Sequence, residues 1–423
     1  MNINEQIPRY SLAERDRRWK LAHELMQEEG LDALLVHGER EGTGPAPFCF
    51  DTYFTNDRPG ATVLFPREGD PVSLVSLPMY ISDHFESANR GDQVWIAPEN
   101  MRFPRAPEKV AGVLKEFGSD SGTIGIVGME PYPPYYFVPP MPAALRAGLG
   151  KLLPGASFKP VGHHLAIMSF VQSEEELAVI RYAARIGDEM VRAMLETTRP
   201  GVNEGEIYAA GMAAAYRRGV AAPGMLLWSG PESIAWGSPP WVYRPQQPRV
   251  IEEGDVVLAE VFVNFGMKET QHQVMIAAGE VHPDFHRAAQ TARAAYDAGL
   301  AALKPDSRFE DVVQVMREPV EQAGGQFVHP VVHGLNPFGP VSGVPLAIGS
   351  LPEAENYHVH AEIPPIMHEL ILKEGMTFAF EPNCAFGRRT ANIGGTVIVG
   401  NVGAIELTPF TAGLLNAGAK TKT

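Results

Sequence analysis

Gly254-Asp255-Val256-Val257-Leu258-Ala259-Glu260 joins a turn residue to an apolar run that ends in an acid. β-Branched and apolar residues continue to position 265, and a second such run covers residues 273–277, so the pattern predicts two strands. Gly266 lies between the two runs, where it suits the turn of a hairpin. We therefore expect a β-hairpin that carries Glu260 on its first strand.

Three further segments follow this hairpin, and each joins glycine to a histidine, an acid or a β-rich run. They are His333-Gly334, Glu374-Gly375-Met376 through Glu381-Pro382, and Gly394-Gly395-Thr396-Val397-Ile398-Val399. Each motif is weak by itself, but the order and spacing of all four are specific.

In this order the segments resemble the catalytic domain shared by methionine aminopeptidases, prolidase, aminopeptidase P and creatinase, the pita-bread superfamily. The resemblance covers nearly the whole chain, because the first part resembles the N-terminal domain of creatinase, including Asn56-Asp57-Arg58-Pro59-Gly60. It implies an α/β protein with a mixed α/β creatinase-type domain in residues 1–168. A pita-bread domain is implied for residues 169–423.

The residues themselves also indicate two α/β domains. Short β-rich runs alternate with helical or turn segments in the first part, at residues 31–36, 61–65, 72–76 and 123–127. Ser173-Glu174-Glu175-Glu176 then combines a capping residue with acids at the positive end of a helix. Further helices are predicted at residues 11–29, 204–218, 282–303 and 308–323. A chain of 423 residues is too long for one typical core.

The resemblance bears directly on metal binding. In the metallopeptidases of the superfamily, Asp, Asp, His, Glu and Glu hold two divalent ions. Those positions fall here on Glu260, Gln271, His333, Glu381 and Gly394, and only His333 and Glu381 match. Gln271 offers a neutral carbonyl and Gly394 no side chain, whereas paired cations need bridging carboxylates. We therefore expect no metal cofactor; the alternative is a single ion on Glu260, His333 and Glu381.

Without a metal, Glu260 and Glu381 would lie near each other with restricted access to water. Burial and like charge both raise a carboxyl pKa, so one of the two is expected to keep a proton near neutral pH. His333 would then be the catalytic acid–base group, and Gln271 would orient substrate. The resemblance supports this prediction, because creatinase hydrolyses a C–N bond without a metal. An inert site of hydrogen-bonded relics is the alternative.

Several other side chains are candidates for binding substrate. Gln273 would share the strand face of Gln271, whereas His272 would face away unless the hairpin differs by one residue in register. His272 stays a candidate. Trp236 would line a pocket or only pack, in a segment where creatinase and the proline peptidases carry a histidine and this chain has none. His360 follows another histidine at strand-like spacing, in the region where the resemblance places a second active-site histidine.

Arg58 is the candidate for binding an anionic group. In creatinase a similar Arg-Pro element reaches across the dimer and binds the substrate carboxylate, so the resemblance implies that role for Arg58 in a homodimer. A surface arginine without a role is the alternative.

The amino-acid composition limits the kinds of partner that the chain is expected to bind. The net charge of -15 disfavours nucleic acid, since phosphate binding needs a concentrated basic face. No uncharged apolar run is long enough to span a bilayer, and the first residues lack the apolar core of a signal peptide. Two cysteines are too few for a disulfide framework. We expect a cytoplasmic protein without nucleic-acid or membrane partners.

Taken together, the sequence predicts a metal-independent hydrolase that cleaves a C–N or related bond in a small carboxylated molecule. Three alternatives remain open: a small-molecule lyase on the same fold, a single-metal Xaa-Pro-type peptidase, and a catalytically dead binding protein.

Overall fold

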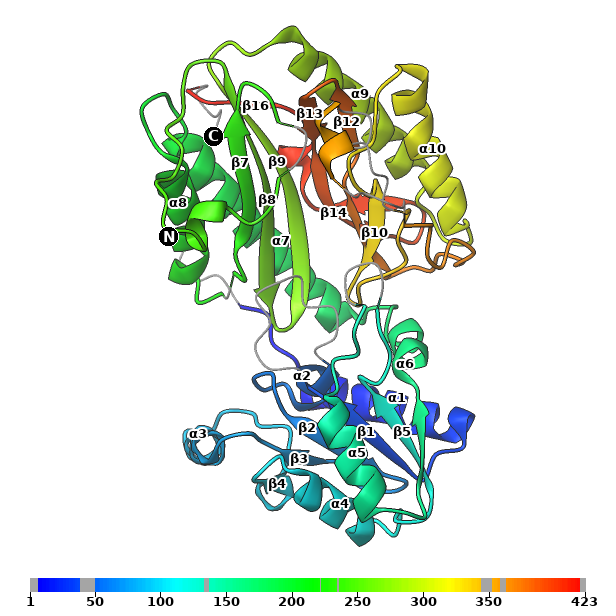
Figure 1. The fold of residues 1–423 in the computed structure, drawn as a ribbon. Coiled ribbons are helices and arrows are strands. Elements are labelled where there is room, and N and C mark those ends of the chain that lie inside the picture. Colours follow the sequence, from blue (N-terminus) through cyan, green and yellow to red (C-terminus); the bar gives the residue numbers. More distant parts are fainter. Residues whose placement is uncertain are drawn as a thin grey trace. The chain divides into compact units, whose positions relative to one another are not determined.

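The computed structural model describes residues 7–38, 50–132, 137–220, 222–233, 236–343, 352–357 and 363–418 (Figure 1). The chain forms two compact units, with the change from one to the other between Phe170 and Val171. The boundary expected from the sequence lies between residues 168 and 169. We call the two parts the N-terminal unit and the C-terminal unit.

A six-stranded sheet in the order β4-β3-β2-β1-β5-β6 forms the centre of the N-terminal unit. Its strands are β1 (Ala33–His37), β2 (Thr62–Pro66), β3 (Val72–Leu74), β4 (Met101–Arg102), β5 (Thr123–Val127) and β6 (Ser157–Pro160). Strand β1 runs antiparallel to β2 and parallel to β5, so the sheet is mixed, as the sequence predicts.

Helices cover both faces of this sheet. They are α1 (Leu12–Glu29), α2 (Phe50–Thr55), α3 (Pro78–Asn89), α4 (Pro107–Glu116), α5 (Ala143–Leu152) and α6 (Gly162–Met168), with a 3-10 turn at Pro98–Asn100. Leu34 and Val36 of β1 belong to a core shared with α1, whereas Ala33 and Leu35 belong to a core shared with α4 and α5. Alternation along the strand therefore supplies both layers.

The C-terminal unit contains an eight-stranded sheet whose main path is β10-β11-β14-β9-β8-β7. Its strands are β7 (Met225–Gly230), β8 (Asp255–Phe265), β9 (Lys268–Ala278), β10 (Val332–Leu335), β11 (Thr377–Phe380), β14 (Gly394–Val399), β15 (Ala404–Glu406) and β16 (Leu415–Asn416). Strands β12 (Asn383–Phe386) and β13 (Arg389–Asn392) pair separately. The helices are α7 (Glu174–Thr197), α8 (Glu204–Arg217), α9 (Pro283–Ala302) and α10 (Phe309–Gln322), with 3-10 turns at Pro240–Val242, Pro352–Asn356 and Pro409–Thr411. Among the described residues, no helix combines the length and apolar character needed to cross a membrane.

Helix α7 begins at the capping signal that the sequence predicts. Ser173 Oγ accepts from the Glu176 backbone N–H at 3.2 Å, and Glu176 Oε2 accepts from the Ser173 N–H at 2.8 Å. The Glu176 side chain also pairs with Lys268 of β9 at 2.8 Å. The cap therefore fixes the start of α7 relative to the hairpin.

The β8–β9 hairpin determines which side chains reach the candidate site. Its register places Glu260 opposite Gln273 and Val261 opposite His272. Alternate residues of β8, such as Val257 and Val261, pack into the core against α7, which lies along the hairpin in Figure 1. Glu260 and Gln273 therefore point to the other face of the sheet.

Candidate functional site

The carboxylate of Glu381 is the centre of a buried polar cluster. Glu381 follows the last residue of β11, and β10 beside it carries His333. Oε1 of Glu381 accepts from Nε2 of His333 at 3.0 Å and from Nε2 of Gln273 at 2.9 Å. Oε2 lies 3.1 Å from Nδ1 of His329. Three nitrogen donors, two from residues 329–333 and one from β9, thus converge on one carboxylate.

His333 is held at both ring nitrogens. Nδ1 lies 2.9 Å from the Gly334 carbonyl oxygen, which can only accept, and Nε2 faces Glu381. Burial opposes charging of the ring, but the Glu381 carboxylate outweighs it and raises the pKa of His333. His333 is therefore placed as an imidazolium with both of its N–H groups occupied.

His329 differs, because only one of its ring nitrogens is engaged. Burial alone would raise the pKa of Glu381, but the His333 charge and the His329 and His333 hydrogen bonds outweigh it and lower that pKa to about 2. The ionised carboxylate can only accept, so Nδ1 of His329 donates to it. Nε2 of His329 is buried and has no hydrogen-bond partner among the described residues. In the neutral form of the ring, with the hydrogen on Nδ1, this Nε2 carries a lone pair that no described residue engages.

Glu260 completes a carboxyl pair with Glu381. Burial, followed by the charge of Glu381, raises the pKa of Glu260 well above its usual value, although hydrogen bonds from Gln273 and Trp236 oppose the shift. The negative charge of the pair therefore resides on Glu381 and the proton on Glu260. The Trp236 ring also packs edge-on against the His329 ring, with centroids 4.5 Å apart.

The amide of Gln273 bridges the two acids. Its Nε2 faces them, while its Oε1 accepts from Nδ2 of Asn392 at 2.5 Å. Asn392 therefore fixes which end of the Gln273 amide points to the acids.

Gln271 is held by a third acid, Glu269. Nε2 of Gln271 donates to Oε1 of Glu269 at 2.8 Å, and Glu269 is fixed in turn by Asn336, whose Oδ1 accepts from its backbone N–H at 2.8 Å. Oε1 of Gln271 is buried and has no partner in the described part of the chain. Oε1 of Gln271 is thus a hydrogen-bond acceptor to which no described residue donates.

Gly394 leaves no room for a ligand side chain. Its φ is 108°, and a Cβ built there would lie 2.4 Å from the Phe380 carbonyl oxygen and 3.0 Å from the Tyr296 ring. An acid at this position would require the backbone to move.

These residues do not fit a pair of bridged divalent ions. Glu381 is already surrounded by nitrogen donors, Gln271 directs its Nε2 to Glu269, and Gly394 has no space for an acid. Within the described ranges, no group of three or more His, Cys, Asp and Glu side chains is arranged to hold an ion.

His272, whose face the sequence left open, lies on the side of the sheet away from the cluster. Strand alternation places it on the face opposite Glu260, where its Nε2 lies 3.2 Å from Oδ1 of Asp188 in α7. A Cβ on Gly187 would lie 2.0 Å from the His272 ring, so the glycine is what allows the ring to pack there.

Two further candidates lie apart from this cluster. Arg58 belongs to the N-terminal unit, where it donates to Asp83 at 2.5 Å and lies 3.5 Å from Asp57. Its role as a carboxylate clamp stays a prediction. His360 lies outside the described residues.

Sequence reasoning missed His329, Glu269 and Asn392. One signal was available for His329, which precedes His333 by only four residues in the sequence. Glu269 and Asn392 act through partners distant in sequence, and no local pattern marks them.

The family model described as metallopeptidase family M24 matches residues 178–401. No curated protein matches the sequence.

Solved structures match over almost the full chain. The prolidase from Pyrococcus horikoshii OT3 is 18% identical with a TM-score of 0.68, covering 93% of this chain and 98% of that one. The Xaa-Pro dipeptidase from Bacillus anthracis is 17% identical with a TM-score of 0.70, covering 95% and 99%. The dipeptidase PepE from Mycobacterium ulcerans is 19% identical with a TM-score of 0.69, covering 97% and 99%. At these identities the likeness concerns the fold.

Proposed function

The chain belongs to metallopeptidase family M24, a family of hydrolases with the pita-bread fold, and on that premise we propose that it hydrolyses a C–N bond without a metal ion. The resemblance to the superfamily and the expected fold class are confirmed. What is proposed beyond them is the metal independence, the bond and the roles of the residues.

The proposal rests on the set of hydrogen bonds that the Glu381 carboxylate accepts. Its carboxylate accepts from the side chains of His333, His329 and Gln273. The Glu381 carboxylate is thus surrounded by cationic and polar N–H groups. In a metal site, a metal ion would take their place as its partner. This supports acid–base chemistry in place of Lewis-acid chemistry.

His329 takes the role of general base in this proposal. Its free Nε2 accepts a proton from water as the water oxygen bonds to the substrate carbon, and Glu381 stabilises the imidazolium through Nδ1. The sequence assigned this role to His333, but both ring nitrogens of His333 are occupied. His333 is instead proposed to hold Glu381 ionised and in position.

Glu260 is proposed as the general acid. Its proton passes to the leaving nitrogen as the C–N bond breaks, which leaves Glu260 ionised and His329 protonated. Return of the His329 proton to Glu260 through solvent completes the cycle. Gln271 would orient the substrate by accepting an N–H on its bare Oε1.

The proposed substrate is a small carboxylated molecule, and the proposed assembly is a homodimer. Both rest on the Arg58-Pro59 element and its resemblance to creatinase. Arg58 remains a candidate clamp because a partly exposed ion pair, such as its pair with Asp83, is weak and can be exchanged for a substrate carboxylate.

A hydrolysis screen on metal-free protein tests the proposal. Protein purified in chelator would be offered Xaa-Pro dipeptides and small N-substituted carboxylic acids, with release of amine as the readout. We expect turnover that chelator does not reduce and that His329→Ala abolishes. His286→Ala, at an exposed position on α9, is the matched control and should keep full activity. Turnover that chelator removes and added divalent ion restores would refute metal independence.

A further inference from the structure

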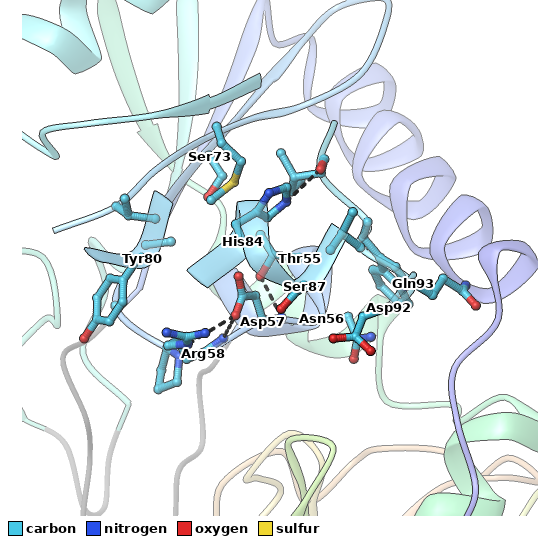
Figure 2. A pocket seen from close by; sticks show the side chains of 18 residues that line it. Thr55, Asn56, Asp57, Arg58, Ser73, Tyr80, His84, Ser87, Asp92 and Gln93 are labelled. Atoms are coloured by element: carbon cyan, nitrogen blue, oxygen red, sulfur yellow. Dashed lines mark hydrogen bonds and ion pairs between the residues drawn. The ribbon is translucent and has the colours of Figure 1, made fainter. Parts of the chain in front are cut away.

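The N-terminal unit contains a cavity of about 170 Å³ formed within residues 55–101 (Figure 2). One wall is the loop after α2, a second is α3, and a third is the segment at residues 92–96. The cavity is close in size to an engineered apolar cavity of about 150 Å³ that binds benzene. One six-membered ring with a small substituent therefore matches the space.

Trp95, one of the residues that line this cavity, has a buried hydrogen-bond donor without an acceptor in the described part of the chain. Trp95 is 2% exposed, and its Nε1 has no hydrogen-bond partner among the described residues. An indole N–H can only donate. Because an unsatisfied buried donor is costly, a ligand that brings an acceptor is favoured.

A hydrogen-bond acceptor lines the same cavity. Nε2 of His84 lies 3.0 Å from the Ile96 carbonyl oxygen, as the dashed line in Figure 2 shows. The carbonyl only accepts, so Nε2 carries the hydrogen and Nδ1 of the neutral ring carries a lone pair. That lone pair is available to a donor on a ligand.

The charged side chains Arg58, Asp57 and Asp92 that line the cavity already take part in ion pairs. Arg58 pairs with Asp57 and with Asp83, and Asp92 pairs with Arg90 at 3.3 Å. An anionic ligand would have to compete with two carboxylates for Arg58. A ligand without net charge leaves both ion pairs of Arg58 in place, whereas a carboxylate would bind there only by displacing one of them.

Apolar side chains complete the lining. Val75, Ile96, Met101 and Ala61 surround the polar groups. They suit the face of a ring.

We propose that this cavity binds a small, uncharged, planar molecule that carries an amide, such as a lactam or a primary carboxamide. The amide carbonyl accepts from Trp95 Nε1, and an amide N–H donates to His84 Nδ1. The ring packs against Val75, Ile96 and Met101. The proposed contacts use neither Glu381 nor His329, although Arg58, the candidate carboxylate clamp, also lines the cavity.

Titration of the full chain with benzamide tests the proposal. In protein labelled at the methionine methyl groups, the Met101 signal should shift saturably with a Kd in the millimolar range. The signal of Met225, in the core of the C-terminal unit, is the internal reference and should stay in place. Toluene, which lacks the amide, should bind at least about fivefold more weakly than benzamide. Benzoate should also bind more weakly, because it lacks the N–H and carries a charge.

Substitution of Trp95 separates a ligand contact from a structural role. Trp95→Phe keeps a ring but removes the N–H, and should weaken benzamide about tenfold while changing toluene binding by less than about threefold. Equal losses for both ligands would overturn the proposal. So would benzoate binding more tightly than benzamide, or no saturable Met101 shift in wild type. If Trp95→Phe does not fold, the comparison of the three ligands on wild type still decides.

Discussion

His329 and His333 illustrate how hydrogen-bond partners separate two neighbouring residues of the same type. Both imidazoles touch Glu381, but only His329 keeps a nitrogen without a partner among the described residues. A general base needs a nitrogen whose lone pair is not already engaged by another group. Identity and position in the chain therefore do not assign the catalytic histidine.

This difference predicts that substitution of His329 mainly affects catalysis, whereas substitution of His333 mainly affects stability. His329→Ala should lower kcat about 10²- to 10⁴-fold, since it removes the base. His333→Ala should lower the free energy of unfolding by about 3–5 kcal/mol, because it removes one partner of a buried ion pair. Kinetics on the substrate found in the screen, with urea unfolding of each variant, measure both. Full activity in His329→Ala would contradict the assignment.

Asp51 gives a prediction about pH and stability. Burial, against hydrogen bonds from the Ala61 and Gly60 backbone N–H groups, raises its pKa from 3.8 to about 6. A raised folded-state pKa contributes stability that is fully present below pH 3.8 and is lost as the pH rises through 6. The loss amounts to about 3 kcal/mol.

Asp51→Asn isolates this contribution because the variant side chain cannot ionise yet keeps an acceptor for the Gly60 and Ala61 N–H groups. Urea unfolding would be followed from about pH 4 to about pH 7 for the variant and for wild type. Over this pH range the difference in unfolding free energy between the two proteins should shift in favour of the variant by about 2.4 kcal/mol. A difference independent of pH would show that the carboxyl titrates normally.

At the scale of elements, the sequence predicts a helix start or a hairpin correctly where the determining contacts lie within a few residues. The Ser173–Glu176 cap starts α7, and the apolar runs around Gly266 form the β8–β9 hairpin. Both depend on contacts that the local sequence itself supplies. The side of the sheet to which each residue of β9 points depends on the register between β8 and β9. The local sequence does not fix that register, so it could not decide the side on which His272 lies.

Strand β14 yields a prediction about the lost ligand position. Gly394→Ala should lower the free energy of unfolding by about 3 kcal/mol or more, because its φ is positive and the added Cβ meets the Phe380 carbonyl oxygen. Gly387→Ala is the matched control, since Gly387 also has a positive φ but nothing within 4 Å of an added Cβ. It should cost about 1 kcal/mol.

Thermal unfolding of the two variants measures these costs. Equal and small losses would mean that β14 can move to admit a side chain. The position could then accept an acid, and only the surroundings of Glu381 and Gln271 would still disfavour a pair of ions.

At the scale of the whole molecule, each unit has its own sheet and its own core, and the polar cluster lies within the C-terminal unit. Whether the cluster binds a metal ion therefore depends on residues of the C-terminal unit. A tightly bound ion stabilises the folded state by mass action, and about 100-fold excess over Kd would contribute about 2.7 kcal/mol.

We predict that divalent ions leave the melting temperature unchanged. Chelated protein would be compared with protein given Mn²⁺, Co²⁺ or Zn²⁺ at about 0.1 M salt, and Tm values should agree within about 1 °C. Inhibition by chelator together with a rise in Tm on adding one of these ions would favour the single-metal peptidase.

Sequence alone determined the α/β class, the mixed N-terminal sheet, the capped start of α7, the hairpin and the loss of most metal-ligand residue types. Those features follow from residue identity, period and nearby turn or cap chemistry, all of which are local. Tertiary structure decided which nitrogen is free, which acid keeps the proton and which face His272 occupies. These depend on partners such as Glu381, Gln273 and Asp188 that come from distant segments, and on burial that exists only once the chain has folded.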